Sequence, residues 1–168
     1  MPRLHALELL PDAAGEAAVR RDWQALRDAG LPSMLDHTGA SNTPHVTVIA
    51  VPEIEPADER LAADLLGPVL PVAARLSGLA LLGGRRVSVA RLVDVPDELV
   101  TAVLRLRAGT RGHQHPGWLP HVTLARRVER ADVPRVLEAV AGDGEPLSLV
   151  SLRRWDPDEL SVHPVVPR

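Results

Sequence analysis

A four-residue motif occurs twice in this chain of 168 residues, once in each half. The sequence PHVT at residues 44–47 returns at residues 120–123. Each copy follows a stretch rich in turn-forming residues and opens a run of β-forming residues. A repeat in the same structural context predicts that the chain uses one folding unit twice.

The hydrophobic pattern supports this duplication. It predicts strands at residues 4–10, 45–51, 76–82, 87–95, 121–128, 147–154 and 160–163, and helices from Asp12 to Gly30 and at 58–66, 96–109 and 132–141. We therefore expect an α+β fold that forms a single bilobal domain over residues 1–168. Its two pseudo-symmetric, βαβ-containing halves should place antiparallel sheets around a central cleft.

The repeated motif suits chemistry at phosphorus. Side chains alternate across a strand, so His45 and Thr47 share one face, as do His121 and Thr123. If the halves pack about an approximate two-fold axis, these faces meet across the cleft. One imidazole can then take the proton from the attacking oxygen while the other protonates the leaving oxygen. The threonine hydroxyls can donate to the non-bridging oxygens, and the arrangement needs no metal ion or other cofactor.

Two His-x-Thr-x motifs in a chain of this length and element order resemble the two-histidine phosphoesterase superfamily, especially its bacterial 2'-5' RNA ligase and cyclic phosphodiesterase branch. The resemblance covers nearly the whole chain, because residues 79–84 and 118–120 match a Gly-containing strand and the approach to the second motif. It implies a bilobal fold and metal-independent chemistry on 2',3'-cyclic phosphate or 2'-5' linked ends of RNA or nucleotides. It also implies that the two histidines are the acid and the base, and that the two threonines hold the phosphate.

Three further residues are candidates for substrate binding. The resemblance assigns a role to Arg126, although an unbroken strand from the second motif would turn Arg126 away and point Arg127 into the cleft. Either a bulge corrects this direction or Arg127 takes the role. Trp118 either stacks on a base at the rim of the cleft or packs in the core. The family often has an aromatic residue near Leu81 or Leu82, and this chain has none there.

The amino-acid composition limits the kinds of partner that the protein can bind. Lys and Arg number 19 against 22 Asp and Glu, so the chain lacks the basic field that long duplex nucleic acid requires, and we expect a short RNA or nucleotide substrate. The absence of cysteine excludes disulfides and thiolate zinc sites. We interpret His113 and His115 as loop residues and expect no metal site. Without a run of membrane-span length or a secretory signal, we expect a cytoplasmic monomer with no membrane partner.

The sequence thus predicts a metal-independent phosphodiesterase that resembles a 2'-5' RNA ligase. One alternative is a non-catalytic module that binds RNA or nucleotide phosphate ends, and turnover would distinguish the two. A second alternative is a ferredoxin-like interaction domain in which His45 and His121 lie far apart or buried. The natural substrate, the direction of the reaction and the choice of acid and base stay open at this point.

Overall fold

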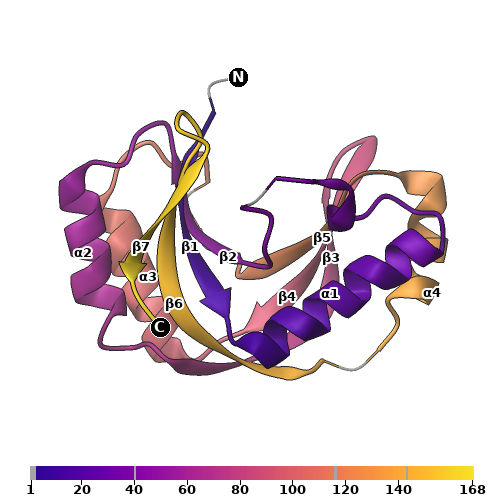
Figure 1. Cartoon of the computed structure of the whole chain (residues 1–168), viewed down its shortest axis with the longest axis horizontal. Coiled ribbons are helices and arrows are strands. Elements are labelled where there is room, and N and C mark those ends of the chain that lie inside the picture. Colours follow the sequence, from indigo (N-terminus) through magenta and orange to yellow (C-terminus); the bar gives the residue numbers. More distant parts are fainter. Residues whose placement is uncertain (1–2, 40, 116, 143) are drawn as a thin grey trace.

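The computed structural model describes residues 3–39, 41–115, 117–142 and 144–168. Along the chain, the elements are β1 (His5–Pro11), α1 (Ala13–Asp28), β2 (Val46–Val51), α2 (Pro56–Leu66), β3 (Val72–Gly83), β4 (Arg86–Asp94), α3 (Asp97–Gly109), β5 (His121–Glu129), α4 (Val133–Ala139), β6 (Pro146–Asp156) and β7 (Ser161–Val166) (Figure 1). Short 3-10 turns occupy Met34–Asp36 and Arg130–Asp132.

The seven strands of the described residues belong to one antiparallel sheet of order β2-β1-β6-β3-β4-β5, with β7 paired to β6. Strand β6 joins the two lobes, because its first residues pair with β3 and its later residues pair with β1 and β7. The first lobe is β2-β1-β6-β7 and the second is β3-β4-β5, and they diverge like the arms of a U (Figure 1). The predicted bilobal α+β architecture is confirmed, and the lobes share a continuous sheet.

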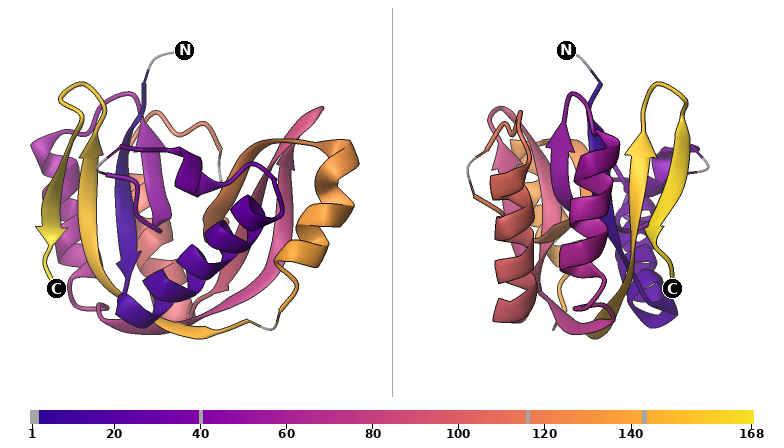
Figure 2. Two further views of the ribbon diagram at one scale, coloured as in Figure 1. Left: turned by 45° about the vertical axis from the view of Figure 1, so that its right-hand side comes forward. Right: turned by 90° about the vertical axis from the view of Figure 1, so that its left-hand side faces the viewer.

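The helices cross between the halves of the sequence. Helix α1 follows β1 yet packs against β5 and α4 of the second lobe, whereas α3 follows β4 yet packs against α2 and β2 of the first lobe (Figure 2). The buried side chains of both lobes form one hydrophobic cluster, in which Trp23 is the largest fully buried residue. Each half of the chain therefore covers the strands of the other half.

Local signals explain where the elements begin and end. The carboxylate of Asp12 accepts a hydrogen bond from the Gly15 amide and caps α1, and Gly30 follows its end with a φ of 69°. Helix α2 begins at Pro56, two residues earlier than the pattern predicts, because proline suits the first helical position. Helix α4 is shorter than predicted and ends at Ala139.

Within the described residues, none of the helices is long and apolar enough to cross a membrane.

Candidate active site

The two motifs occupy the strands at the two ends of the sheet order, β2 and β5, which approach each other. His45 directly precedes β2, and His121 is the first residue of β5. In β2, Val46 and Val48 are fully buried while Thr47 between them is partly exposed. The alternation expected from the motif is thus present, with valines in the core and the threonine on the other face.

Both histidines are held in the same way. Nδ1 of His45 lies 2.8 Å from the carbonyl oxygen of Thr43, and Nδ1 of His121 lies 2.6 Å from that of Leu119. A carbonyl oxygen only accepts, so each Nδ1 carries a proton and donates it to the chain two residues earlier. This fixes each ring and leaves Nε2 as the nitrogen available for proton transfer.

Two tryptophans repeat the symmetry of the motifs. The indole Nε1 of Trp118 donates to the Thr47 carbonyl oxygen at 2.9 Å, and that of Trp23 donates to the Thr123 carbonyl oxygen at 3.0 Å. Backbone groups on end strands otherwise lack partners, so each indole satisfies one of them. Trp118 therefore has a structural role, and its side chain also lines the cavity described next.

A cavity of about 860 Å³ lies between the lobes. The described residues that line it include Thr47 and Val48 of the first motif and His121 of the second, but neither His45 nor Thr123. Its walls come from β2, the end of β3 and the loop before β5, and they are largely apolar, with Leu81, Leu82 and Leu119 among them. The cavity therefore combines the polar side chains of Thr47 and His121 with apolar walls.

Arg107 of α3 is the charged residue among the described residues that line this cavity. Its guanidinium donates to the carbonyl oxygens of Val48 and His115, and so ties α3 to β2 and to the loop before β5. Burial lowers the pKa of Arg107. Nε2 of His113 lies 3.0 Å from the Arg107 carbonyl oxygen, and burial together with the Arg107 charge lowers the pKa of this histidine. His113 and His115 belong to a loop, as expected.

Arg126 and Arg127 lie at a bulge in β5. Ala125 pairs with Val89 and Val128 pairs with Val87, so the two arginines together face a single residue of β4. Arg127 has a φ of 58°, and both side chains are exposed. The bulge considered from the sequence is therefore present, although neither arginine is among the described residues that line the cavity.

A buried ion pair beside the first motif was missed by sequence reasoning. Glu8 of β1 pairs across the strands with Thr47, and its carboxylate accepts a 2.8 Å hydrogen bond from Nε of Arg153. The other carboxylate oxygen lies 3.3 Å from Nε2 of His45, and Arg153 also donates to the Ser41 carbonyl oxygen. A glutamate between the apolar residues Leu7 and Leu9 was a signal that could have singled out Glu8, although not its partner.

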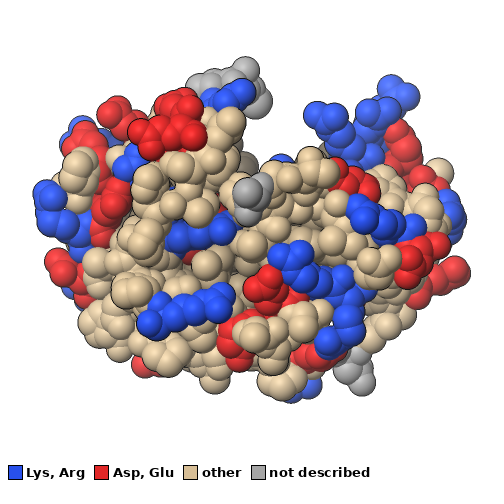
Figure 3. Space-filling model, viewed as in Figure 1, with Lys and Arg blue, Asp and Glu red and all other residues tan. Residues whose placement is uncertain are grey.

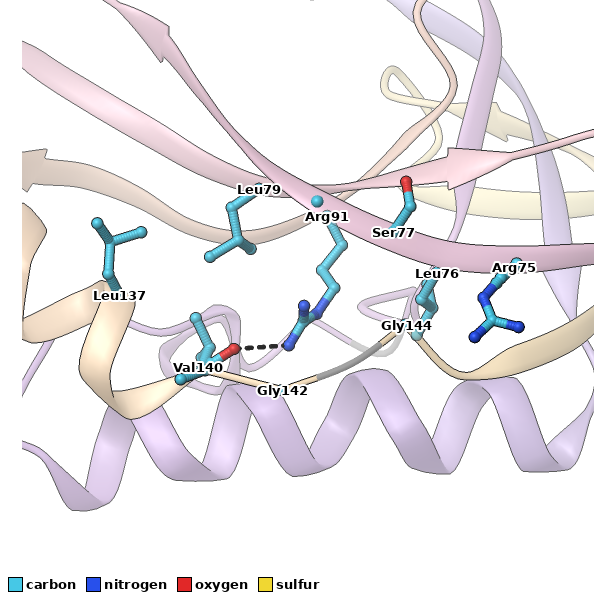
Figure 4. Close-up of a pocket in the computed structure, with 11 residues that line it drawn as sticks. Arg75, Leu76, Ser77, Leu79, Arg91, Leu137, Val140, Gly142 and Gly144 are labelled. Atoms are coloured by element: carbon cyan, nitrogen blue, oxygen red, sulfur yellow. Dashed lines mark hydrogen bonds between the residues drawn. The ribbon is translucent and has the colours of Figure 1, made fainter.

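A second hollow of about 580 Å³ lies between β3 and the segment after α4 (Figure 4). Arg91 is the buried cation in it, and its guanidinium is held by Asp22 and by the Val140 carbonyl oxygen. The described residues that line this hollow include no member of either motif. Its arginine joins β4 to α1 and α4, so we interpret this hollow as part of the packing of the second lobe.

The chain is similar to known proteins in both sequence and fold. A family model described as "2'-5' RNA ligase superfamily" matches residues 13–163. A crystal structure of a phosphoesterase superposes with a TM-score of 0.53 at 17% identity, covering 100% of this chain and 97% of the other. The structure of E. coli LigT with 3'-AMP gives 0.52 at 16% identity, covering 97% and 93%. Kluyveromyces marxianus Usb1 gives 0.54 at 12% identity, covering 99% of both. No curated protein matches the chain.

Proposed function

Because this chain belongs to the 2'-5' RNA ligase superfamily, we propose that it is a phosphodiesterase acting on 2',3'-cyclic phosphate or 2'-5' linked ends of short RNA or nucleotides. The observation that carries the proposal is the cavity between the lobes, which is lined by Thr47 of one motif and His121 of the other. A site shared by two halves of a duplicated fold suits a reaction that needs two proton-transfer groups on opposite sides of one atom.

In the hydrolytic direction, a water oxygen attacks the phosphorus of the cyclic phosphate and one P–O ester bond breaks. One of His45 and His121 takes the proton from the water, while the other gives a proton to the leaving ribose oxygen. The tethered Nδ1 atoms support this assignment, because they leave Nε2 as the nitrogen of each ring that can take up or give a proton. Thr47 and Thr123 donate to the non-bridging oxygens as negative charge develops on them.

The proposal needs no metal ion. The carboxylate beside His45 is already paired with the Arg153 guanidinium, so it is poorly placed to become a cation ligand. We expect EDTA to leave the rate unchanged. Loss of activity in EDTA that zinc or manganese restores would replace the two-histidine mechanism with a metal-dependent one.

The substrate class is supported by shape and charge. LigT is solved with 3'-AMP, which is the size of ligand that the apolar walls around Leu81 and Leu119 can enclose. Basic side chains gather at the upper end of the second lobe (Figure 3). Arg85 in the turn between β3 and β4, and Arg126 and Arg127 at the bulge of β5, are exposed. With a net charge of −3, this local group favours a short anionic strand over long duplex nucleic acid. We also propose that the protein acts as a cytoplasmic monomer, which light scattering can check for the oligomeric state.

The decisive experiment is a turnover screen with 2',3'-cyclic mononucleotides, 2'-5' linked dinucleotides and ADP-ribose cyclic phosphate. We expect the wild-type protein to convert at least one class, and His121→Ala to convert it roughly 10²–10⁴-fold more slowly. Binding of 3'-AMP without turnover of any substrate would instead indicate the non-catalytic module that recognises phosphate ends. Turnover by His121→Ala at the wild-type rate would remove the second motif from the chemistry.

A further inference from the structure

The first motif has charged neighbours in the sheet. Thr47 of β2 pairs with Glu8 of β1, and Glu8 pairs in turn with Arg153 of β6. Residues that pair directly across antiparallel strands point to the same face, so the carboxylate and the guanidinium share the face of Thr47. A row of three strands thus places an ion pair beside the histidine that opens the motif.

Among the described residues, the strands beside the second motif have alanines at the matching positions. Thr123 of β5 pairs with Ala90 of β4, and Ala90 pairs with Ala80 of β3. The pseudo-symmetric row therefore holds two alanines where the first lobe holds a glutamate and an arginine. Two alanines in the matching row indicate that this sheet geometry does not itself require charged side chains at these positions.

The ion pair is buried, with Glu8 5% and Arg153 9% exposed. Burying two charges costs desolvation energy that their attraction offsets only with good geometry. The geometry is good here, because Arg153 Nε lies 2.8 Å from one oxygen of Glu8 and Arg153 also holds the Ser41 carbonyl of the loop before β2. This leaves the second oxygen of Glu8 fixed at 3.3 Å from Nε2 of His45.

The contact between Glu8 and His45 depends on the protons of the imidazole. Nδ1 already holds a proton, because it faces the Thr43 carbonyl oxygen. A second proton on Nε2 places a positive ring against a negative carboxylate, whereas a bare Nε2 would turn its lone pair toward that carboxylate. The two atoms lie at ion-pair distance without the geometry of a hydrogen bond, so a proton on Nε2 would stay available for transfer.

We propose that Glu8 is a positioning residue for His45 and makes this histidine the proton donor of the pair, with His121 as the base. The inference rests on the proposed function. It assigns the acid and the base, which the two identical motifs alone do not distinguish. Glu8 from β1 lies against His45, and Arg153 from β6 is bonded to Glu8. The charged and titratable residues among the described lining of the cavity are Arg107 from α3, His113 and His115 from the loop before β5, and His121 from β5. In hydrolysis, His45 gives its Nε2 proton to the leaving ribose oxygen and regains it from solvent before the next turnover.

The test compares Glu8→Gln with a matched control, Asp22→Asn. Both substitutions neutralise the carboxylate of an Arg–carboxylate pair. Among the described residues, the side chains of Asp22 and Arg91 form no hydrogen bond with either motif, although Arg91 pairs across the strands with Val122. We expect Glu8→Gln to lower kcat about tenfold, with little change in KM, because part of the contribution of general acid catalysis is lost. The limb of the pH–rate profile that requires a protonated histidine should move to lower pH. Asp22→Asn should keep the wild-type profile at equal folded fraction.

Two further measurements keep the outcome decisive. Glu8→Asp retains the charge, so its kcat and the position of its pH limb should lie between those of the wild type and of Glu8→Gln. If Glu8→Gln does not fold, Glu8→Asp serves as the test variant in its place. The ¹⁵N shifts of His45 at pH 7 report the protonated share of the ring without any turnover, and this share should fall in Glu8→Gln but not in Asp22→Asn. An unchanged share in the folded glutamine variant, or a profile that keeps its wild-type shape, overturns the role of Glu8. Absence of turnover in the wild type would instead count against the proposed function alone.

Discussion

At the scale of single residues, the chemistry depends on the few atoms that fix each imidazole. His45 and His121 share the tether from Nδ1 to a backbone carbonyl, but the carboxylate of Glu8 adjoins His45. Equal tethers and unequal surroundings are what a reaction needs when one ring must accept a proton and the other must donate one.

The residue scale gives the first prediction. His45→Ala and His121→Ala should each lower kcat by roughly 10²–10⁴-fold, because each removes one proton-transfer group. Thr47→Val and Thr123→Val should lower it less, since each removes one donor to the phosphate oxygens. Steady-state kinetics on the best substrate of the screen measures all four, with circular dichroism as the check on folding. A threonine variant with unchanged kcat/KM would show that its hydroxyl does not reach the substrate.

At the same scale, Asp156 links stability to pH at the turn between β6 and β7. Burial raises the pKa of Asp156, but hydrogen bonds from the amides of Glu159 and Asp158, with His5 and Arg154 nearby, outweigh it and leave this pKa below its usual value. A lowered carboxyl pKa in the folded state adds stability above the unfolded value, and that stability is lost as the pH falls.

Asp156→Asn should therefore lower the melting temperature at neutral pH. Its difference from the wild type should shrink as the pH falls from about 4, where the carboxyl of the unfolded chain takes up a proton, toward the lower pKa of the folded state. Thermal unfolding between pH 3 and pH 7 measures this. A constant difference over the whole range would exclude the charge of Asp156 as the cause.

At the scale of elements, local signals predicted most of the strands and helices, because caps, prolines and alternation act over a few residues. The alternation in β2 also placed Thr47 opposite the core face. The pairing of Glu8 with Arg153 was not accessible, because 145 positions separate them and strand order decides which distant residues meet. The bulge in β5 was only one of two alternatives in the sequence. Glycine is the usual residue at a positive φ, and the residue with the positive φ here is Arg127.

The bulge gives the prediction at this scale. The double variant Arg126→Ala/Arg127→Ala should lose more kcat/KM on an oligonucleotide with a 2',3'-cyclic phosphate end than on a cyclic mononucleotide, because exposed arginines meet the additional phosphates. The salt dependence of log(kcat/KM) should flatten by about one for each phosphate that the variant no longer binds. Arg60→Ala, which removes an exposed arginine on α2, is the control. Equal losses of kcat/KM on both substrates would show that the two arginines contact only the reacting phosphate.

At the scale of the whole molecule, the exchange of helices makes each lobe depend on the other half of the chain. Trp23 of α1 reaches the Thr123 carbonyl in the second lobe, and Arg107 of α3 reaches the Val48 carbonyl in the first. The hydrophobic cluster runs through both lobes. We therefore propose that residues 1–168 fold as one unit, so that the two motifs are assembled together or not at all.

The last prediction tests this coupling through Trp23→Phe. Loss of the indole N–H leaves the Thr123 carbonyl oxygen without its partner, which costs about 1–3 kcal/mol for a buried acceptor. If the lobes fold as one unit, urea unfolding followed by far-UV circular dichroism and by the fluorescence of Trp118 and Trp155 gives coincident single transitions, all shifted to lower urea by the variant. Trp118→Phe removes the equivalent bond to Thr47 and should shift the same single transition. Two separable transitions, with Trp23→Phe moving one of them alone, would show that the lobes are independent domains and that their cleft forms only after each has folded.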